Sequence, residues 1–406
     1  MTREQTQKEV LALSEKSDIL ILELPTGYGK SKLAIDIQSS LTEVDSRYNF
    51  LYPKTLLIIA EIAHKINWEA EYKKHKMEHL LPNTTIIFYA SLKNYTDTEW
   101  DLVVMDECHH LSDLRQEFLE TLKFNKLIGL SATLNYGIKN AIRGIFSDMV
   151  VSEYKITSKE AINAEVLPQP AIILHELELD NKEPSQTVIF KRGNPKTQLA
   201  PCAWKDRFKY IGKSAHYELP VKCTEQEKYD HLTNEIEYRK SQYYADRVEW
   251  KRNIWMRRAL DRKIYLGELK TRYVQKLLTE IPSSERLICF CTNIEQANQL
   301  GCEDTVVHSK VNGVSNVIAS FQDGQTNALF AVGMLTEGMN LSNIDRGIIA
   351  QLDGSELKGV QKMGRAMRAK NPKIHILFFK NTRDQEYLEK FLEGVDLKFI
   401  EMAAKQ

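Results

Sequence analysis

The sequence predicts an α/β protein with two parallel-sheet domains in tandem and a loop-rich, helical insertion between them. Short apolar runs alternate with longer helical patterns in residues 1–150 and again in the last third of the chain. Such runs, separated by helices, indicate parallel sheets that are buried on both faces. A chain of 406 residues is also too long for one ordinary core. We therefore expect domains at 1–156 and 263–406, with the linker and insertion at 157–262.

Apolar runs mark the expected strands. In the N-terminal domain they are 19–24, 55–60, 85–89, 102–105 and 127–130, and in the C-terminal domain they are 287–290, 328–332, 347–351 and 374–379. The segment between the domains begins with a proline-rich half and continues as a long helical pattern over 225–281. Functional side chains of parallel sheets gather at the carboxyl ends of the strands. The residues that follow these runs are therefore the first candidates for a site.

The residues after the first expected strand have the pattern of a phosphate-binding loop. Leu24-Pro-Thr-Gly-Tyr-Gly-Lys-Ser31 joins that strand to a helical pattern. Backbone N–H groups of such a loop and the N-terminus of the following helix bind an anion, and a lysine adds a mobile positive charge. The strict GxxxxGKS/T pattern would place glycine at Leu24, so an ordinary strand-to-helix turn is the alternative. The residues expected to bind ATP are Pro25, Thr26, Gly27, Tyr28, Gly29, Lys30 and Ser31, of which Ser31 also binds Mg²⁺.

Two acids follow the expected strand 102–105 directly. Asp106 can hold Mg²⁺, and Glu107 can accept a proton from an attacking water molecule. Taken alone, such a pair is common at a helix N-terminus, where carboxylates interact favourably with the helix dipole. Together with the phosphate loop, the pair predicts a site for phosphoryl transfer.

The acid pair and a later segment resemble motifs of one family. Asp106-Glu-Cys-His109 resembles the DExH box of the superfamily 2 helicases, and Leu130-Ser-Ala-Thr-Leu134 resembles their SAT motif. Further segments resemble the remaining family motifs in the family's order: 58–68, 86–92, 287–292, 307–309, 330–340 and 361–368. The resemblance implies two RecA-like domains that clamp MgATP in the cleft between them. It also implies that nucleic acid crosses both domains, with backbone contacts in the first two of these segments.

The resemblance assigns roles to further residues. Ser131 and Thr133 would couple the state of ATP to domain movement. Arg365 and Arg368 would reach the γ-phosphate from the second domain, because the planar, permanent charge of arginine suits phosphate, and Gln361 would help to position water or phosphate. In isolation, that last segment would be better interpreted as a basic, solvated helix face. Gly338 is a further expected ATP ligand, and Gln5 is a candidate reader of adenine or simply part of a solvated helix start. The residues expected to contact nucleic acid are Lys93, Thr292, Thr336, Arg252, Arg257 and Arg258.

The last three arginines lie in a basic and aromatic helical stretch. From Tyr238 to Arg272 the chain has 11 Lys and Arg against four Asp and Glu, together with six aromatic residues. Such a mixture suits phosphate contact combined with base stacking. The aromatic residues equally suit packing against a domain while the arginines are solvated.

Composition narrows the cellular setting. Basic and acidic residues number 55 each, so any basic surface must be local. The six cysteines lack paired spacing, which is typical of a reduced compartment. The N-terminus has no apolar signal core, and no apolar stretch approaches the roughly 20 residues that span a bilayer. We expect a cytoplasmic protein that makes no membrane contact, with the nucleoid or the cytoplasm of a phage-infected host as settings.

The compact motifs most resemble those of XPB-like, phage UvsW-like and restriction-motor helicases. This resemblance implies an ATP-dependent DNA helicase or translocase that acts on duplex or branched DNA in replication, recombination or repair. Partners from those processes, or a nuclease, are expected, and DNA is favoured over RNA. An RNA helicase and the motor subunit of a restriction or defence complex are the alternatives. A binding module without turnover is a third, but Lys30, Glu107, Arg365 and Arg368 together argue against it.

Overall fold

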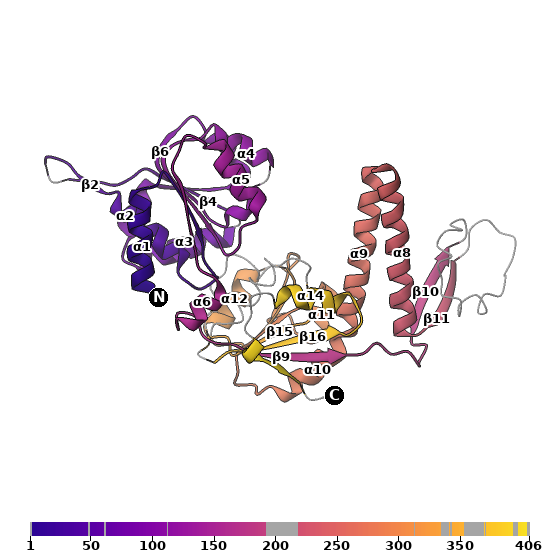
Figure 1. Cartoon of the computed structure of the whole chain (residues 1–406). Coiled ribbons are helices and arrows are strands. Elements are labelled where there is room, and N and C mark those ends of the chain that lie inside the picture. The colour runs from indigo at the N-terminus through magenta and orange to yellow at the C-terminus, as the bar shows by residue number, and fades with distance from the viewer. Residues whose placement is uncertain are drawn as a thin grey trace.

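A computed structural model shows two α/β domains and a projecting pair of long helices (Figure 1). The structure describes residues 2–47, 49–60, 62–111, 113–191, 218–311, 313–333, 341, 343–352, 369, 371–392 and 397–403. Over these ranges, no helix combines the length and the apolar character that a membrane crossing requires.

The first domain contains a six-stranded parallel sheet. Its strands lie in the order β5-β4-β6-β7-β1-β8, and each neighbouring pair is parallel. The strands are β1 (Ile19–Glu23), β4 (Thr55–Ile59), β5 (Thr84–Phe88), β6 (Glu99–Met105), β7 (Lys123–Ser131) and β8 (Val151–Lys155). The five strands expected from apolar runs are thus confirmed, and β8 completes the sheet.

Helices cover both faces of this sheet (Figure 1). Leu20 and Leu22 pack with residues of the first three helices, whereas Ile19 and Ile21 pack with residues of the next two. These four side chains are fully buried because alternate residues of a strand point to opposite faces. The helices are α1 (Arg3–Glu15), α2 (Lys30–Ser40), α3 (Ile62–Lys74), α4 (Asp113–Glu120) and α5 (Tyr136–Ile145), with the 3-10 turns η1 (Glu78–Asn83), η2 (Tyr89–Asn94) and η3 (Cys108–His110) and the small hairpin β2 (Glu43–Val44) and β3 (Phe50–Leu51).

The second domain contains a seven-stranded sheet, again with every pair parallel. Its order is β13-β14-β12-β15-β16-β9-β17. The strands are β9 (Ala171–Leu177), β12 (Leu287–Phe290), β13 (Val306–Val307), β14 (Ala328–Ala331), β15 (Arg346–Ile349), β16 (Lys373–Phe379) and β17 (Ile400–Met402). The accompanying helices are α10 (Thr271–Glu280), α11 (Ile294–Leu300), α12 (Val314–Gln322) and α14 (Arg383–Phe391), with the 3-10 turn η5 (Leu397–Phe399). The fold predicted for both halves of the chain is therefore confirmed.

Strand β9 belongs to this second sheet, although it lies inside the segment predicted as linker and insertion. It pairs with β16 along its whole length and with β17 on its other side. The bounds 157–262 stay a prediction; in the structure, α6 (Ser158–Asn163) and the residues after it precede β9, and the chain leaves the sheet after β9. Pro168 and Pro170 stand just before the strand, and prolines of this kind indicate a loop.

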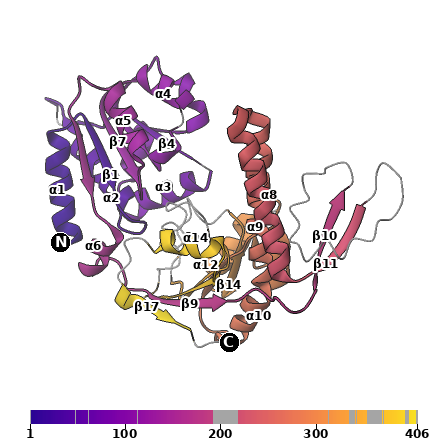
Figure 2. The ribbon, with the colours of Figure 1, turned by 45° about the vertical axis from the view of Figure 1, so that its right-hand side comes forward.

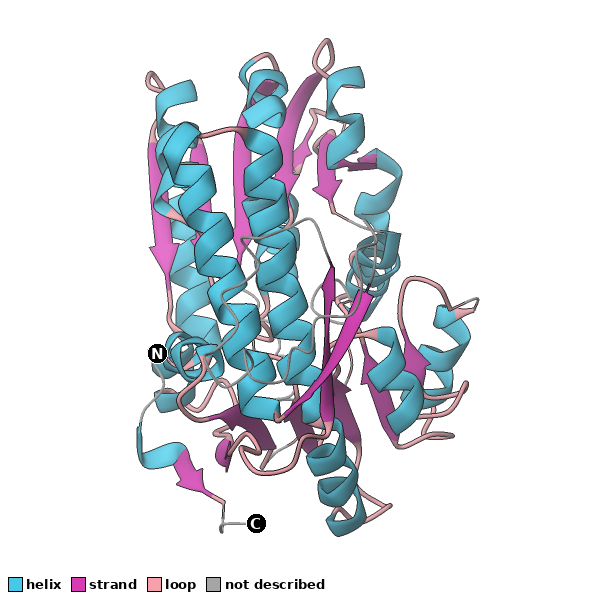
Figure 3. Cartoon of the chain, turned by 90° about the vertical axis from the view of Figure 1, so that its right-hand side faces the viewer, coloured by secondary structure: helices cyan, strands magenta, loops and turns pink. Residues whose placement is uncertain are grey.

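In its described residues, 178–191 and 218–269, the insertion contains a two-helix hairpin and a two-stranded ribbon (Figure 2). The hairpin is formed by α8 (Glu225–Asp246) and α9 (Glu249–Leu269), and the ribbon by β10 (Gln186–Lys191) and β11 (Glu218–Cys223), which pair antiparallel. Figure 3, viewed from the hairpin side, shows the ribbon in front of the helices, and Lys228 of α8 donates to the side-chain oxygen of Gln186 of β10 at 3.3 Å. Helix α9 runs past the predicted domain boundary at 262 and leads directly into α10 of the second domain.

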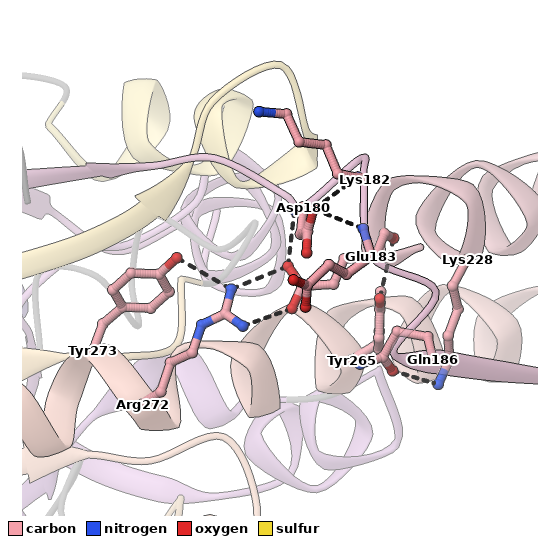
Figure 4. A network of polar contacts seen from close by, with 9 residues as sticks. Asp180, Lys182, Glu183, Gln186, Lys228, Tyr265, Arg272 and Tyr273 are labelled. Carbon is pink, nitrogen blue, oxygen red and sulfur yellow. Dashed lines mark hydrogen bonds and ion pairs between the residues drawn. The ribbon is translucent and has the colours of Figure 1, made fainter. Parts of the chain in front are cut away.

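Buried polar contacts fix the base of the hairpin to the second domain (Figure 4). The guanidinium of Arg272 donates to both carboxylate oxygens of Glu225 at 2.8 and 3.1 Å. Glu225 also accepts from the backbone N–H of Asp180 at 3.0 Å, and its own carbonyl accepts from the hydroxyl of Tyr265 at 3.1 Å. Because Glu225 is 1% exposed, these donors replace the water that its charge would otherwise require. These contacts thus anchor the hairpin at its base.

Candidate active site

The phosphate loop lies between β1 and α2 and opens into free space. Gly27 and Gly29 have φ angles of 86° and 111°, in the left-handed region that favours glycine. Gly29 is the N-cap of α2, and no side chain caps this helix. A Cβ placed on Gly29 would meet no atom within 4 Å. The first N–H groups of α2 therefore face an open space, as an anion-binding site requires.

Helix α1 contacts this loop through two hydrogen bonds. The hydroxyl of Tyr28 lies 2.7 Å from that of Thr6, and the guanidinium of Arg3 donates to the carbonyl of Gly27 at 3.2 Å. Lys30 donates to the carbonyl of Leu24 at 3.1 Å, so its ammonium lies back over the loop. A cavity of about 440 Å³ adjoins the loop and is lined by Glu9, Tyr28, Tyr154, Ile156 and Asn163, among others.

The acid pair stands at the carboxyl end of β6. The N–H of Asp106 donates to the carbonyl of Ile58 at 2.9 Å and so continues the pairing with β4. Glu107 then has φ 48° and ψ 56°, a left-handed conformation that costs a non-glycine residue of order 1–3 kcal/mol and that clusters at functional sites. The two carboxylates are 14% and 13% exposed. Both are therefore largely shielded yet open to a small ligand.

Three side chains from neighbouring elements surround Asp106. The indole N–H of Trp68 donates to Oδ2 at 2.8 Å, and Nδ1 of His64 lies 3.6 Å from the same oxygen. The hydroxyl of Tyr89 donates to the backbone carbonyl of Asp106 at 3.0 Å. Burial, together with the charges of Cys108 and the acid pair, raises the pKa of Tyr89 well above its ordinary value. Its hydroxyl therefore keeps the proton that it donates.

His109 connects the acid pair to the end of β7. Its Nδ1 lies 3.4 Å from Oε2 of Glu107 and 3.2 Å from the hydroxyl of Ser131. Ser131, which is fully buried, donates in turn to the carbonyl of Thr133 at 2.6 Å. A continuous polar path thus runs from Glu107 to the SAT segment. Cys108 beneath it is fully buried, and burial raises the pKa of its thiol, which argues against a nucleophilic role.

The remaining residues predicted to bind ATP or to act in catalysis lie outside the described residues or at the start of α1. Thr336, Gly338, Gln361, Arg365 and Arg368 lie outside the described residues. Gln5 is exposed, and its side chain accepts from the backbone N–H of Thr2 at 2.7 Å in a capping box that starts α1. The interpretation as a helix start thus matches the contact that Gln5 makes here.

The residues predicted to contact nucleic acid divide into exposed and buried ones. Lys93 in η2 is exposed, as are Arg252 and Arg257 on α9. Arg258 instead forms ion pairs with Glu235 and Asp261, both at 3.0 Å. Thr292 is 7% exposed, so the structure does not place it on a surface that nucleic acid reaches. It lies under Gly267 of α9, where an added Cβ would come within 1.8 Å of its hydroxyl oxygen.

Sequence reasoning did not single out Trp68, Tyr89 or His64. The segments 58–68 and 86–92 were expected to contact nucleic acid, but not to reach Asp106. Trp68 and Tyr89 are 3% exposed, and a buried indole N–H or phenol O–H needs a hydrogen-bond partner. The sequence shows the residue types that need such a partner, but it does not show that the partner is Asp106.

Comparisons with known proteins show which families and which fold this chain resembles. Residues 2–136 match the family described as "Type III restriction enzyme, res subunit", and residues 269–370 match "Helicase conserved C-terminal domain". A curated relative, the ATP-dependent DNA helicase MPH1 of Vanderwaltozyma polyspora, is 34% identical over 77 residues. That match covers 19% of this chain and 7% of the relative. The helicase domain of Hef from Pyrococcus furiosus has a similar fold, with a TM-score of 0.50 and 15% identity over 95% of this chain and 97% of that one.

Proposed function

We propose that this chain, which belongs to the superfamily 2 helicases, a family of ATP-hydrolysing enzymes, is a DNA-dependent motor that moves along or separates duplex or branched DNA. The observation that carries the proposal is the position of the phosphate loop and the acid pair. They follow β1 and β6 of one parallel sheet, with β7 between them and the SAT segment at its end. Polar groups at the carboxyl ends of such strands face a common crevice.

The residues of the first domain suit the binding of MgATP. Lys30 and the N-terminus of α2 would hold phosphate oxygens, since both provide positive charge at an open surface. Oxygen ligands are those that Mg²⁺ prefers, and the hydroxyl of Ser31 and the partly shielded carboxylate of Asp106 provide them. Mg²⁺ bound there would neutralise charge on the phosphates. Glu107 would accept the proton of the attacking water, and the cavity beside the loop would leave room for the nucleoside.

The second domain would complete the site when the two domains close. Arg365 and Arg368 would then stabilise the charge that spreads over the transferred phosphoryl group, with Gln361 and Gly338 beside it. The path from Glu107 through His109 to Ser131 supports a coupling role for the SAT segment. A change at the acid pair would reach the end of β7 by this path, and Thr133 takes part through its carbonyl.

DNA is the proposed substrate, with RNA as the alternative. The curated relative carries the printed name of a DNA helicase, which favours DNA. Lys93, Thr336 and the exposed arginines of α9 would contact the phosphate backbone, and such contacts read no sequence. Partner proteins from replication, recombination or repair would direct the motor to its sites.

The decisive experiment compares ATP hydrolysis with single-stranded DNA, duplex DNA, forked DNA and RNA. We expect DNA to raise the rate of ATP hydrolysis several-fold, most with duplex or forked substrates. DNA bound across both domains would favour their closed state. Stimulation by RNA alone would reassign the substrate. A rate that no nucleic acid raises would overturn the proposed function.

A motor subunit of a restriction complex is a second candidate. The match of residues 2–136 to a restriction-enzyme family favours it. Purification of the tagged chain from its native cell distinguishes a freestanding motor from a restriction subunit. A nuclease or methyltransferase subunit would copurify in stoichiometric amount only with a restriction subunit.

The exposed arginines of α9 provide a test of whether the hairpin contacts DNA. Changing Arg252 and Arg257 to Glu is expected to weaken DNA binding and to lower the slope of log K against log salt by roughly two, one unit for each lost phosphate contact. Fluorescence anisotropy over a salt series measures both effects. Arg258 stays unchanged because its ion pairs with Glu235 and Asp261 stabilise the hairpin.

The control for the hairpin variant carries the same change in charge elsewhere. Lys276 and Lys390 are exposed on α10 and α14 of the second domain, so their replacement by Glu alters net charge equally. If both double variants bind DNA with the same affinity and salt dependence, the hairpin does not contact DNA.

A further inference from the structure

Trp68 on helix α3 is hydrogen-bonded directly to the carboxylate of Asp106. Its Nε1 lies 2.8 Å from Oδ2, and its ring is 3% exposed. Burial alone does not determine this partner. Trp100 of the same domain is 4% exposed, and its indole N–H donates to the backbone carbonyl of Tyr95 at 3.4 Å.

The contact fixes one side of a carboxylate whose other side is also held. Oδ1 of Asp106 accepts from the backbone N–H of Glu107 at 3.1 Å. A carboxylate has about four lone-pair positions, so positions other than those that face Trp68, the N–H of Glu107 and Nδ1 of His64, which lies 3.6 Å from Oδ2, can bind a metal ion or its water. Losing one of the two donors would let the group rotate about its last torsion angle, which is broad for aspartate. Trp68 therefore restricts the direction in which the remaining lone pairs point.

The elements that hold Asp106 also present basic residues to solvent. On α3, Trp68 is buried and Lys65 is exposed; on η2, Tyr89 is buried and Lys93 is exposed. The hydroxyl of Tyr89 holds the backbone carbonyl of Asp106 at 3.0 Å. Strands β4 and β5, from whose carboxyl ends these elements continue, lie next to each other, and β4 borders β6. A polyanion bound to the two lysines would thus act on two elements that both contact Asp106.

We propose that Trp68 is a positioning residue through which DNA bound at α3 and η2 sets the orientation of Asp106 and so the affinity of the site for a divalent cation. The inference rests on the proposed function, because it takes Asp106 as a metal ligand and DNA as the polyanion. Its physical basis is that loss of a group hydrogen-bonded to a metal ligand typically changes metal affinity or activity 10–100-fold. Trp68 would act through Asp106, to which its indole N–H donates.

The test uses Mn²⁺ as the probe, with a non-hydrolysable ATP analogue and with or without a DNA duplex. Bound Mn²⁺ is counted by its electron paramagnetic resonance signal, so the measurement does not depend on turnover. DNA is expected to tighten Mn²⁺ binding in the wild-type protein. In Trp68→Phe, which keeps a ring but loses the N–H, Mn²⁺ affinity is expected to fall about 10-fold and to respond no longer to DNA.

Trp100→Phe is the matched control, since it removes an equally buried indole from the same domain. It should leave Mn²⁺ affinity and its response to DNA as in the wild type. Tyr89→Phe removes a single oxygen and provides a second variant if Trp68→Phe fails to fold. It is expected to reduce the response to DNA while anisotropy shows that DNA still binds.

Failure of this inference is distinguishable from failure of the proposed function. If DNA stimulates ATP hydrolysis by the wild-type protein but Trp68→Phe binds Mn²⁺ with unchanged affinity and response, the inference alone is overturned. The same holds if Trp68→Phe and Trp100→Phe lose affinity equally, which would indicate a general effect of removing an indole. If nucleic acid leaves hydrolysis by the wild type unchanged, the proposed function fails and the inference fails with it.

Discussion

Replacing Glu107 with Gln is expected to lower kcat for ATP hydrolysis by about 10²–10⁴-fold, the typical contribution of a positioned general base. The amide keeps the size of the carboxylate but cannot accept the proton of water at neutral pH. Nucleotide affinity should stay near that of the wild type, because Lys30, Ser31 and Asp106 are unchanged. Steady-state hydrolysis in saturating DNA and binding of a fluorescent ATP analogue measure the two properties separately.

Glu117→Gln is the control for this variant. Glu117 is exposed on α4 of the same domain, so the substitution removes the same charge without touching the site. A Glu107→Gln protein that hydrolyses ATP as fast as Glu117→Gln would refute the catalytic assignment. Loss of nucleotide binding together with hydrolysis would instead indicate that the left-handed turn at Glu107 no longer forms.

Features that are local in sequence could be predicted well. The strands β1, β4, β6 and β7 contain continuous apolar runs, which in β6 and β7 fill only the C-terminal part, because helices cover both sides of their sheet. The phosphate loop and the acid pair follow such runs within a few residues. Their positions at the carboxyl ends of strands in one sheet follow from the parallel topology that the pattern already indicates.

Features that depend on distant partners could not be predicted. Strand β9 pairs with β16, which comes about 200 residues later in the sequence, and the prolines before it look like a loop. Thr292 is covered by α9 through the close approach at Gly267, which no local pattern reveals. The link between Trp68 and Asp106 likewise depends on how α3 packs against the sheet.

One missed feature was readable from local pattern alone. Thr2-Arg-Glu-Gln5 has the spacing of a capping box, in which a Ser or Thr at the N-cap and a Glu or Gln three residues later satisfy each other's backbone N–H groups. Both hydrogen bonds are present, at 3.2 and 2.7 Å. The side-chain oxygen of Gln5 thus accepts from the backbone of Thr2, as at a helix start, and its role as a reader of adenine stays a prediction.

Replacing Lys270 with Met should destabilise the second domain by about 3–5 kcal/mol, because removing one partner of a buried ion pair leaves the other charge uncompensated. Lys270 is 1% exposed where α9 meets α10, and its ammonium lies 2.7 Å from Oδ2 of Asp384 on α14. In the variant that carboxylate, which belongs to a residue that is 3% exposed, would lose its cationic partner and keep the backbone N–H of Phe379 as a donor at 3.3 Å. Urea denaturation, monitored by hydrogen exchange of amides in the second domain, measures the decrease in the free energy of unfolding.

Two further variants separate this ion pair from other effects of the substitution. Lys276→Met changes an exposed lysine of α10 and should shift stability little, since isolated surface charges contribute little. Lys270→Met combined with Asp384→Leu should recover part of the loss, because a buried pair replaced by apolar groups is often nearly neutral. Equal stability of Lys270→Met and Lys276→Met would contradict the prediction.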